Sequence, residues 1–454
     1  MVEYTDPNPF KEFHIGHLMS NTIGEAIARL IESQGAEVRR ANYQGDVGLH
    51  VAKSIWGMSK KMEQEGETLS TLEEKSIKER QQFMGAAYAL GAGEYEESEE
   101  TKVEIQKVNQ EIYAQNDGEI AKLYQAGREW SLEYFETIYD RLGTKFDEYF
   151  FESEAGGVGL TVVEEGLAKG VLTEGEGGAV IYEGEKDGLH TRVFRNKLGL
   201  PTYEAKDLGL AKTKYGRYKY DFSVIVTANE ITEYFRVVLR VMEQLYPDLR
   251  KMTLHLPHGV MKLPTGKMSS RTGKVVTGEG LLDELGRVVL AKMGKRQIAD
   301  KEQVADRIAV GAMKWTVLRQ AIGGDIVYDP ETMTNLQGDT GPYVQYTHAR
   351  ACSVLAKAKD ENDKGKNLDM VIEPSELGLA RWVVRYPEVV VQAGREKAPN
   401  VIVSYLYELS SRFNSFYNEN KIAGNESRVL MTRAVKKVLA KGLDVLGIAA
   451  PESM

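Results

Sequence analysis

The sequence has a single cysteine, Cys352, among its 454 residues. One thiol excludes an internal disulfide framework and any zinc site built from several cysteines, and it suits a reducing cytosol. No apolar run approaches the length of a membrane span. The first residues, MVEYTDP, show neither the basic nor the apolar region of a secretory signal. We therefore expect a cytoplasmic protein with no membrane partner.

The chain also lacks an excess of basic residues. Its 58 lysines and arginines against 67 acidic residues give a formal charge of −9. This balance argues against indiscriminate nucleic-acid binding, although a local basic surface can still bind one nucleic acid. The charged and hydrophobic fractions, 28% and 42%, are ordinary for a globular protein. The length suffices for more than one domain, each with its own core.

The first 50 residues have the pattern of a βαβ unit. Residues 2–5 favour a strand, a DPNP turn follows, and apolar residues recur at helical spacing from Leu18 to Ile31. Gly35 is a good helix stop, and residues 36–42 favour a second strand. Ligands of such units bind at the carboxyl ends of the strands, where two histidines fall here.

The helix of this unit opens on a histidine pair, since residues 11–17 read KEFHIGH. His14 and His17 offer imidazole donors, and Gly16 lets an adenine ring or a phosphate lie against bare backbone. The helix N-terminus favours an anion. Two alternatives stay open: the histidines simply cap the helix, or they bind a metal, although no third histidine or cysteine lies nearby.

A second run lies about 250 residues further on, where residues 266–274 read GKMSSRTGK. Such a loop is usually only solvated, but here a strand-like run, residues 256–263, leads into it. Lys267 and the following serine hydroxyls suit a pyrophosphate on which negative charge develops. The two runs together point to attack by a carboxylate on the α-phosphate of ATP.

The composition changes along the rest of the first 280 residues. Residues 50–140 are rich in Glu, Lys and Gln at helical spacing, which predicts a helical insertion. Residues 155–190 are rich in glycine and glutamate, which predicts hairpins. The βα alternation resumes near residue 191, and residues 223–227 (SVIVT) predict a buried strand.

The C-terminal part has no strand signal. Residues 281–318 and 340–446 predict helices, with residues 360–367 as a polar linker inside the second stretch. The expected fold class is therefore α/β: a Rossmann-like domain with a helical insertion, followed by an all-α bundle.

Two acidic positions suggest a binding pocket. Tyr203 and Asp207 are four residues apart on one face of a helix start, and Glu152 follows an apolar run. Each acid could equally be an ordinary capping group or a solvated carboxylate. Converging carboxylates would suit a guanidinium, because its planar fork takes bidentate partners.

Together these motifs resemble arginyl-tRNA synthetase, a class I aminoacyl-tRNA synthetase, over nearly the whole chain. The most specific matches are DPNPFK before HIGH, the Glu152–Ser153 pair, Tyr203-x-x-x-Asp207 and KMSS. Residues 339–350 (DTGPYVQYTHAR) and 405–421 resemble helices of the family's anticodon-binding domain.

The resemblance implies three parts: a class I catalytic domain at residues 1–280 with its insertion at about 50–140, a helical connection at 281–335, and an anticodon-binding domain at 336–454. It implies a ligase of protein biosynthesis that attaches L-arginine to tRNA(Arg) through arginyl-adenylate. ATP, with Mg²⁺, would be the cofactor, and the protein would act as a monomer.

The resemblance also implies a set of site residues. Those for ATP and the transition state are His14, Gly16, His17, Asn229, Glu230, Lys267, Met268 and Ser269. Those for arginine are Asp6, Pro7, Asn8, His17, Glu152, Tyr203, Asp207 and Ile231. Candidates for stacking on tRNA bases or contacting its phosphates are Tyr343, Tyr346, Arg350 and Met454, with helix packing as the alternative for each tyrosine.

The chain departs from the family at three points. Ser270 stands where most class I loops carry a second lysine, and Lys11 is positioned to compensate by contacting phosphate. Ile231 stands where the family commonly has a glutamine, so either another group supplies that contact or arginine binds more weakly. The family's usual N-terminal domain has no counterpart in the given sequence, which is either a natural short form, a truncated form or the product of an incomplete gene. For a natural short form we expect tRNA affinity to depend more on the C-terminal bundle.

Three alternatives remain at this point. The first two are another class I synthetase and a small nucleotidyltransferase with the same histidine turn, although the paired acids and the helical bundle disfavour the latter. The third is an inactive, synthetase-derived RNA-binding protein, against which the intact His14, His17 and Lys267 argue.

Overall fold

The computed structural model describes residues 1–114, 117–262, 277–295, 298–359, 373–374 and 376–454. Its centre is a parallel five-stranded sheet in the order β3-β2-β1-β7-β8. The strands are β1 (Val2–Glu3), β2 (Arg40–Gln44), β3 (Glu148–Phe151), β7 (Ser223–Ala228) and β8 (Thr253–His258). The strand order reverses direction at β1, and in such sheets ligands bind at the carboxyl edge beside the reversal.

The helices that accompany this sheet are α1 (Ile15–Glu32), α7 (Glu152–Ala168), α8 (Tyr203–Arg217), the 3₁₀ turn η3 (Asn229–Ile231), α9 (Thr232–Leu245) and α10 (Pro247–Met252). The predicted βαβ unit is confirmed: β1 and β2 are parallel, with Val2 opposite Arg40, and α1 connects them. The predicted strand at residues 223–227 is confirmed as β7. The second strand begins at Arg40, four residues later than predicted.

The prediction of hairpins over residues 155–190 was wrong for its first part, which is the helix α7. The glycines of this stretch serve close helix packing instead of turns. A Cβ on Gly159 would lie 2.4 Å from the carbonyl oxygen of Ala205, on α8. Hairpins do follow, as a small antiparallel sheet of β4 (Thr173–Glu174), β5 (Val180–Tyr182) and β6 (Arg192–Arg195), with 3₁₀ turns η1 (Glu176–Gly178) and η2 (Gly184–Asp187).

The helical insertion is confirmed and comprises α2 (Leu49–Glu65), α3 (Leu69–Glu73), α4 (Ile77–Glu97), α5 (Glu99–Ala114) and α6 (Glu119–Leu142). It has its own apolar core, which includes Ile55, Met84 and Ile105. Phe10, from the loop after β1, is part of the same core. The insertion therefore holds the loop that leads into the histidine turn.

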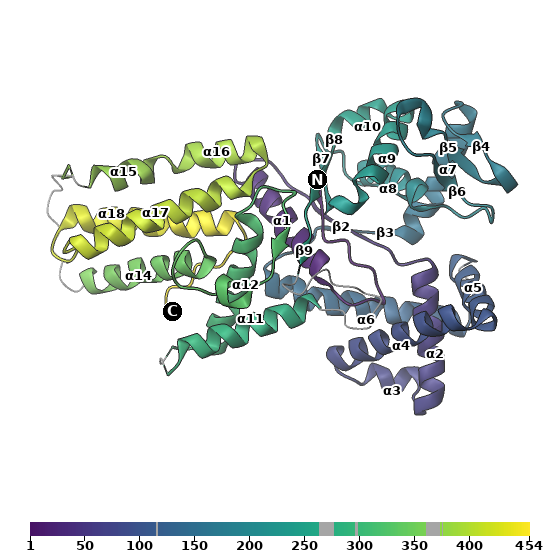
Figure 1. The fold of residues 1–454 in the computed structure, drawn as a ribbon, viewed down its shortest axis with the longest axis horizontal. Helices are drawn as coiled ribbons and strands as arrows, with labels where there is room; N and C mark the ends of the chain where they lie inside the picture. The colour runs from purple at the N-terminus through teal and green to yellow at the C-terminus, as the bar shows by residue number, and fades with distance from the viewer. Residues whose placement is uncertain (115–116, 263–276, 296–297, 360–372, 375) are drawn as a thin grey trace.

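After β8 come β9 (Met261–Lys262), α11 (Gly278–Met293), α12 (Lys301–Leu318), β10 (Ile326–Val327) and α13 (Pro330–Met333). The last helices are α14 (Gly341–Lys359), α15 (Leu377–Val384), α16 (Tyr386–Glu396), α17 (Pro399–Glu419) and α18 (Glu426–Val445), which form the expected bundle. It lies on the opposite side of the molecule from the β4-β5-β6 sheet (Figure 1). The predicted linker, residues 360–367, lies outside the described residues.

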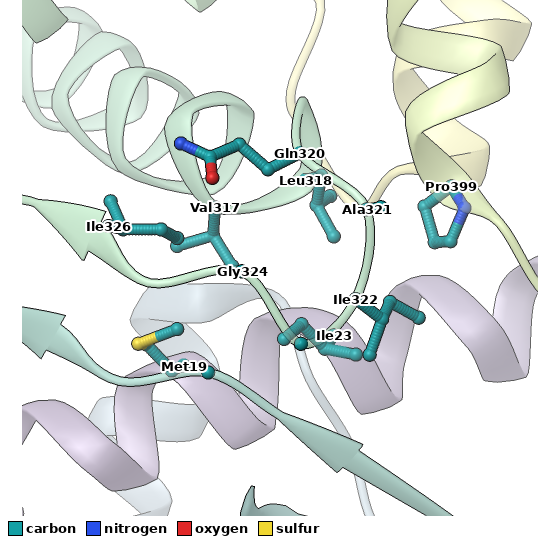
Figure 2. Close-up of a pocket in the computed structure, with 12 residues that line it drawn as sticks. Met19, Ile23, Val317, Leu318, Gln320, Ala321, Ile322, Gly324, Ile326 and Pro399 are labelled. Atoms are coloured by element: carbon teal, nitrogen blue, oxygen red, sulfur yellow. The ribbon is translucent and has the colours of Figure 1, made fainter.

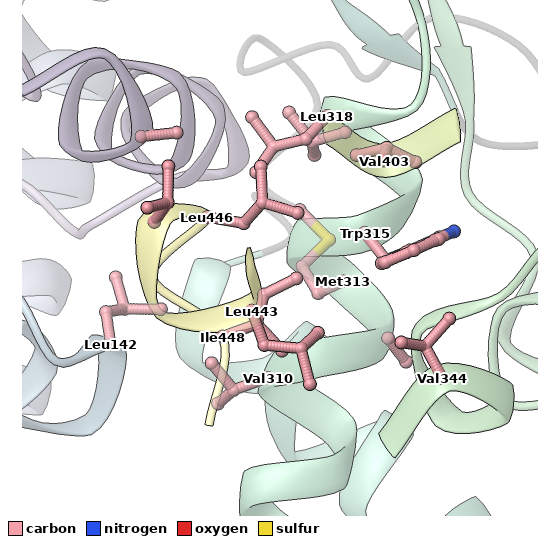
Figure 3. Packing of buried hydrophobic residues seen from close by; sticks show 14 of the residues in the cluster. Leu142, Val310, Met313, Trp315, Leu318, Val344, Val403, Leu443, Leu446 and Ile448 are labelled. Atoms are coloured by element: carbon pink, nitrogen blue, oxygen red, sulfur yellow. The ribbon is translucent and has the colours of Figure 1, made fainter. Parts of the chain in front are cut away.

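The bundle and the nucleotide fold share one core. Helix α12 supplies Met313 and Trp315, which pack with Val344 of α14, Val403 of α17 and Leu443 of α18 (Figure 3). Helix α1 of the nucleotide fold belongs to the same cluster. Among the described helices, none combines the length and apolar character needed to cross a membrane.

Candidate active site

The loop after β1 is held in an unusual backbone conformation. Thr5, Asp6 and Phe10 have φ angles of 79°, 45° and 67°. These angles lie in the left-handed region of the backbone, which residues other than glycine rarely adopt. Such strain persists only where surrounding contacts enforce it. Here Asp6 Oδ1 accepts the backbone N–H of Tyr43 at 2.8 Å, and Phe10 N–H donates to Ser131 Oγ of α6 at 2.9 Å. The loop is thus fixed between the sheet and the insertion.

The two histidines at the start of α1 orient each other. His14 is the N-cap residue: its Nδ1 accepts the N–H of Gly16 at 3.1 Å, and its own N–H donates to Nδ1 of His17 at 3.2 Å. The rings stack with centroids 3.5 Å apart. Because both Nδ1 atoms accept, the proton of each neutral ring must be on Nε2. The capping role is therefore confirmed for His14, and it leaves both Nε2–H groups as donors.

Both imidazoles are neutral at physiological pH. Burial, followed by the positive charge of Lys11, lowers the pKa of His14 to about 4. Burial first, and then the charges of His14 and Lys11, hold the pKa of His17 well below its usual value. An anion placed beside the pair would stabilise their protonated forms, but without one they act as uncharged donors.

Gly16 has a structural role in addition to the predicted one. A Cβ at this position would lie 2.9 Å from Cε1 and 3.0 Å from Nδ1 of His14. The glycine therefore leaves room for the capping imidazole, and its amide is already engaged by that ring.

Lys11 is held beside this pair by the insertion. Its ammonium lies 5.4 Å from the ring centroid of Tyr88, and its carbonyl oxygen accepts from Gln81 Nε2 at 3.3 Å, both residues being on α4. Burial, and then the charge of Lys53, lowers the pKa of Lys11. The arrangement combines one cation with two neutral donors, which suits a phosphate chain.

A second group of polar side chains surrounds Glu152, the first residue of α7. A Cβ on Gly45 would lie 2.3 Å from Asn8 Oδ1 and 3.1 Å from Glu152 Oε1, so these three residues meet at one point. The other oxygen, Oε2, is 2.8 Å from Nζ of Lys206. Burial raises the pKa of Glu152, and the Lys206 charge opposes that shift.

Lys206 itself is almost fully enclosed. It is 4% exposed, and its ammonium donates to the Tyr113 hydroxyl of α5 at 3.1 Å as well as to Glu152. Tyr203, at the start of α8, is 59% exposed, with its ring centroid 5.4 Å from the same ammonium. No sequence pattern signals this ion pair, because Lys206 and Glu152 are 54 residues apart.

Asp207 has a hydroxyl partner, since its Oδ2 accepts from Tyr234 of α9 at 2.5 Å. Burial raises the pKa of Asp207 to about 7; the Tyr234 bond opposes this shift, and the charges of Glu3 and Glu152 add to it. Glu152 and Asp207 thus influence each other electrostatically. We call Asn8, Glu152 and Asp207 the acidic pocket: Glu152 meets Asn8 at the carboxyl edge of the sheet, and Asp207 lines a small cavity with Glu3 and Lys214.

The remaining predicted residues occupy separate places. Asn229, Glu230 and Ile231 form the 3₁₀ turn η3 directly after β7, at the same sheet edge, and Ile231 is 40% exposed. Pro7 is buried in the loop between Asp6 and Asn8. Residues 267–269 of the predicted closing loop (Lys267, Met268 and Ser269) lie outside the described residues.

The predicted RNA-contacting residues gather on and near α14. The Arg350 guanidinium lies 4.9 Å from the Tyr346 ring centroid, and Tyr346 and Met454 line one apolar groove. The Tyr343 hydroxyl accepts from Asn414 Nδ2 of α17 at 3.0 Å, so this tyrosine takes part in helix packing.

Asp46, which no sequence motif marks as a site residue, positions the acidic pocket. This buried carboxylate accepts the N–H of Ser153 at 2.9 Å and its hydroxyl at 2.7 Å. It also accepts from the Tyr124 hydroxyl at 2.9 Å, and Arg128 Nε lies 3.3 Å away. Because Ser153 follows Glu152, this network fixes the start of α7. Only its place in the GDVG turn after β2 could have signalled it.

A separate cavity between α1 and residues 317–326 has no such chemistry. It is lined by Met19, Ile23, Ile322 and other small or apolar residues, with Gln320 as its one polar side chain among the described residues (Figure 2). None of these described lining residues is titratable, so the cavity offers no acid, base or nucleophile.

Comparison with known proteins finds two matching regions in the chain. Residues 1–329 match the family model for the catalytic domain of class I tRNA synthetases of the (R) type, and residues 344–454 match the DALR anticodon-binding domain. The arginine–tRNA ligase of Flavobacterium psychrophilum is 31% identical over 481 residues, which cover 100% of this chain and 79% of that protein. That of Treponema denticola is 30% identical over 471 residues, with 100% and 79% covered.

Solved structures agree. Arginyl-tRNA synthetase of Thermus thermophilus superimposes with a TM-score of 0.81 at 26% identity, covering 100% of this chain and 82% of that one. Methionyl-tRNA synthetase of Mycobacterium tuberculosis, at 12% identity and a TM-score of 0.59, shares the fold over 99% of this chain and 91% of that one. The matching family models, relatives and structures agree with one another, and the chain belongs to the arginyl-tRNA synthetase family of class I aminoacyl-tRNA synthetases.

Proposed function

We propose that this protein attaches L-arginine to tRNA(Arg) in two steps at the sheet edge described above. The arginine carboxylate attacks the α-phosphate of ATP, so that an oxygen–phosphorus bond forms and pyrophosphate leaves. The terminal ribose hydroxyl of the tRNA then takes the arginyl group from the adenylate, and AMP leaves. The observation that carries the proposal is the arrangement of neutral histidine donors beside an acidic pocket that suits a guanidinium.

The ATP end is formed by the start of α1. The Nε2–H groups of His14 and His17 donate to the phosphates, and the Lys11 ammonium compensates charge that develops in the transition state. Gly16 keeps the His14 ring in place. Because neutral donors and a fixed cation need no rearrangement during the reaction, catalysis here is mainly positioning and electrostatics.

Two further segments complete the ATP end. Asn229 and Glu230, in η3, contact the adenosine. Lys267, Met268 and Ser269 close over the pyrophosphate, a role that rests on the sequence resemblance.

Mg²⁺ accompanies ATP in this proposal. Within the described residues no group of three or more histidine, cysteine or acidic side chains comes together in a way that could hold a metal ion. The protein residues therefore suit a metal carried by the phosphates, as is usual for Mg²⁺, and not an all-protein cage. Such a metal supplies charge neutralisation at the β- and γ-phosphates.

The arginine end is formed by the acidic pocket. Glu152 and Asp207 pair with the guanidinium, and Tyr203 also contacts it. Asn8 and His17 contact the amino-acid head group, and the strained loop with Asp6 and Pro7 holds Asn8 in position for this contact. Ile231 offers no hydrogen bond.

The anticodon end is the bundle. Tyr346, Arg350 and Met454 offer stacking and phosphate contacts to the tRNA, with Tyr343 behind them. One chain carries both the catalytic site and the anticodon-binding bundle, and we propose that the protein acts as a monomer in the cytoplasm. Size-exclusion chromatography with light scattering tests the monomeric state.

Aminoacylation of total tRNA with labelled arginine, beside lysine and glutamine, tests the proposed function. Charging with arginine alone supports it; charging with another amino acid, or none, contradicts it. His14→Ala and His17→Ala should reduce adenylate formation strongly. His190→Ala, which removes an exposed histidine near the β4-β5-β6 sheet, is the matched control and should leave activity unchanged. An active Lys11→Ala enzyme would refute the phosphate role of Lys11.

A further inference from the structure

Tyr43, on β2, has a buried hydroxyl with no hydrogen-bond partner among the described residues. Its backbone is well satisfied, because its N–H donates to Asp6 Oδ1 at 2.8 Å. Its ring packs with the cluster that includes Ala41 and Phe150. A buried hydroxyl without a partner lowers stability, so a group that remains in this state invites a functional account.

Packing places this tyrosine beside the two helices that carry the acids. Its cluster contains Ala155 of α7, three residues after Glu152, and Leu210 of α8, three residues after Asp207. Gly45 directly follows β2, and a Cβ at this position would meet Asn8 Oδ1 and Glu152 Oε1. On the next strand Phe150 lies opposite Tyr43, and Glu152 follows two residues later.

The charges around the hydroxyl agree with this position. Burial raises the pKa of Tyr43 well above its usual value, and the carboxylates of Glu152 and Asp207 are the next causes, followed by Glu3 and Asp46. The phenol is therefore neutral, with lone pairs that can accept a hydrogen bond. The charges that act on it most strongly belong to the two acids that we assign to the guanidinium.

Each of those two acids already binds a protein group. One oxygen of Glu152 is committed to Lys206, and one oxygen of Asp207 to the Tyr234 hydroxyl. Each carboxylate thus has one oxygen that accepts no hydrogen bond in these two contacts, whereas a guanidinium carries five N–H donors in a planar fork, so a further acceptor beside the acids can bind one of them. Ile231 cannot add an acceptor.

We propose that the Tyr43 hydroxyl is a substrate-binding group that accepts an N–H of the arginine guanidinium between Glu152 and Asp207. This inference rests on the proposed function, because it requires arginine to bind in this pocket. It also assigns the contact that Ile231 cannot make. The hydroxyl favours arginine over lysine, since a site built for several fixed donors leaves acceptors unpaired when a ligand reaches only some of them.

The test is Tyr43→Phe in the full chain, which keeps the ring and removes only the oxygen. We expect the dissociation constant for arginine, from equilibrium dialysis, to rise about ten- to a hundredfold, the factor for one hydrogen bond to a charged group. The inhibition constant of agmatine, which has the guanidinium but no carboxylate, should rise by a similar factor. The unfolding temperature without ligand should be unchanged or higher, because the variant removes an unpaired buried hydroxyl. A purely structural role would not give this combination.

Two variants serve as controls. Tyr328→Phe removes a hydroxyl bonded to Leu281 O at 3.2 Å and Glu284 at 3.0 Å, and it should lower stability without changing arginine binding. Asp207→Asn should weaken arginine binding. If Asp207→Asn weakens binding and Tyr43→Phe does not, the inference is overturned and the proposed function stands. Unchanged binding in both variants would place arginine elsewhere. A loss for arginine but not for agmatine would also overturn the guanidinium contact.

Discussion

In the proposed function, the raised pKa of Asp207 should make arginine binding depend on pH near neutrality. Burial brings this pKa to about 7, so half of the free protein carries a protonated Asp207 at pH 7. A guanidinium pairs with the ionised carboxylate, and proton release must precede binding. Arginine affinity should therefore increase as the pH rises through the pKa of the free protein.

The magnitude follows from linkage. If only the ionised form binds, the apparent dissociation constant is multiplied by about 11 at pH 6 and by about 1.1 at pH 8, a difference of about tenfold. The histidines at the start of α1 do not interfere, because burial lowers the pKa of His14 to about 4 and holds that of His17 well below its usual value. Equilibrium dialysis with labelled arginine at pH 6, 7 and 8, at constant ionic strength, measures the effect.

The matched control is Asp207→Asn, which cannot ionise. This variant should bind arginine more weakly, with little change between pH 6 and pH 8. The reasoning is refuted if the wild-type protein shows no pH dependence, or if the asparagine variant keeps the tenfold change.

Three other buried contacts give predictions. Lys206→Met leaves the Glu152 carboxylate buried without its cation and should lower the free energy of unfolding by about 3–5 kcal/mol at pH 7. Adding Glu152→Gln to this variant should restore most of the lost free energy of unfolding. If urea denaturation shows that the losses of the two single variants simply add, the pairing of Lys206 with Glu152 is contradicted. Gly45→Ala, whose methyl would lie 2.3 Å from Asn8 Oδ1, should raise the arginine KM about tenfold with little loss of stability; an unchanged KM argues against the pocket. Lys314→Met removes hydrogen bonds to the carbonyl oxygens of Leu142 at 2.6 Å and Gly447 at 2.8 Å, and it should lower the free energy of unfolding by about 2–3 kcal/mol. Equal urea midpoints of the variant and the wild-type protein would show that these bonds do not stabilise the fold.

The sequence predicted those parts of the site that local patterns determine. The histidine turn, the start of α8 at Tyr203 and the position of Glu152 after a strand all follow from short-range spacing and flanking apolar residues. The hairpin prediction over α7 failed because glycine is ambiguous: at Gly159 it permits close contact with α8 and not a turn.

What the sequence could not predict depends on distant partners. Lys206 reads as an ordinary lysine on a helix, and only the fold brings it to Glu152. Tyr43 reads as a common strand residue, and only the structure shows that its hydroxyl is buried without a partner among the described residues. Sequence patterns report the face on which a side chain lies, but not what another segment presents to it.

Helix α1 joins the two ends of the enzyme mechanically. Its 18 residues span about 27 Å, with the histidine pair at one end. Near the other end Arg29 binds Asp444 of α18 at 3.1 Å. A shift of the bundle that moves Arg29 can tilt α1. A tilt of only about 2° about the Arg29 end displaces the histidines at the other end by about 1 Å, enough to change a reaction rate about a hundredfold. In the proposed function, the contact between the bundle and α1 therefore also sets the position of the histidines relative to ATP, although the bundle itself does not contact ATP.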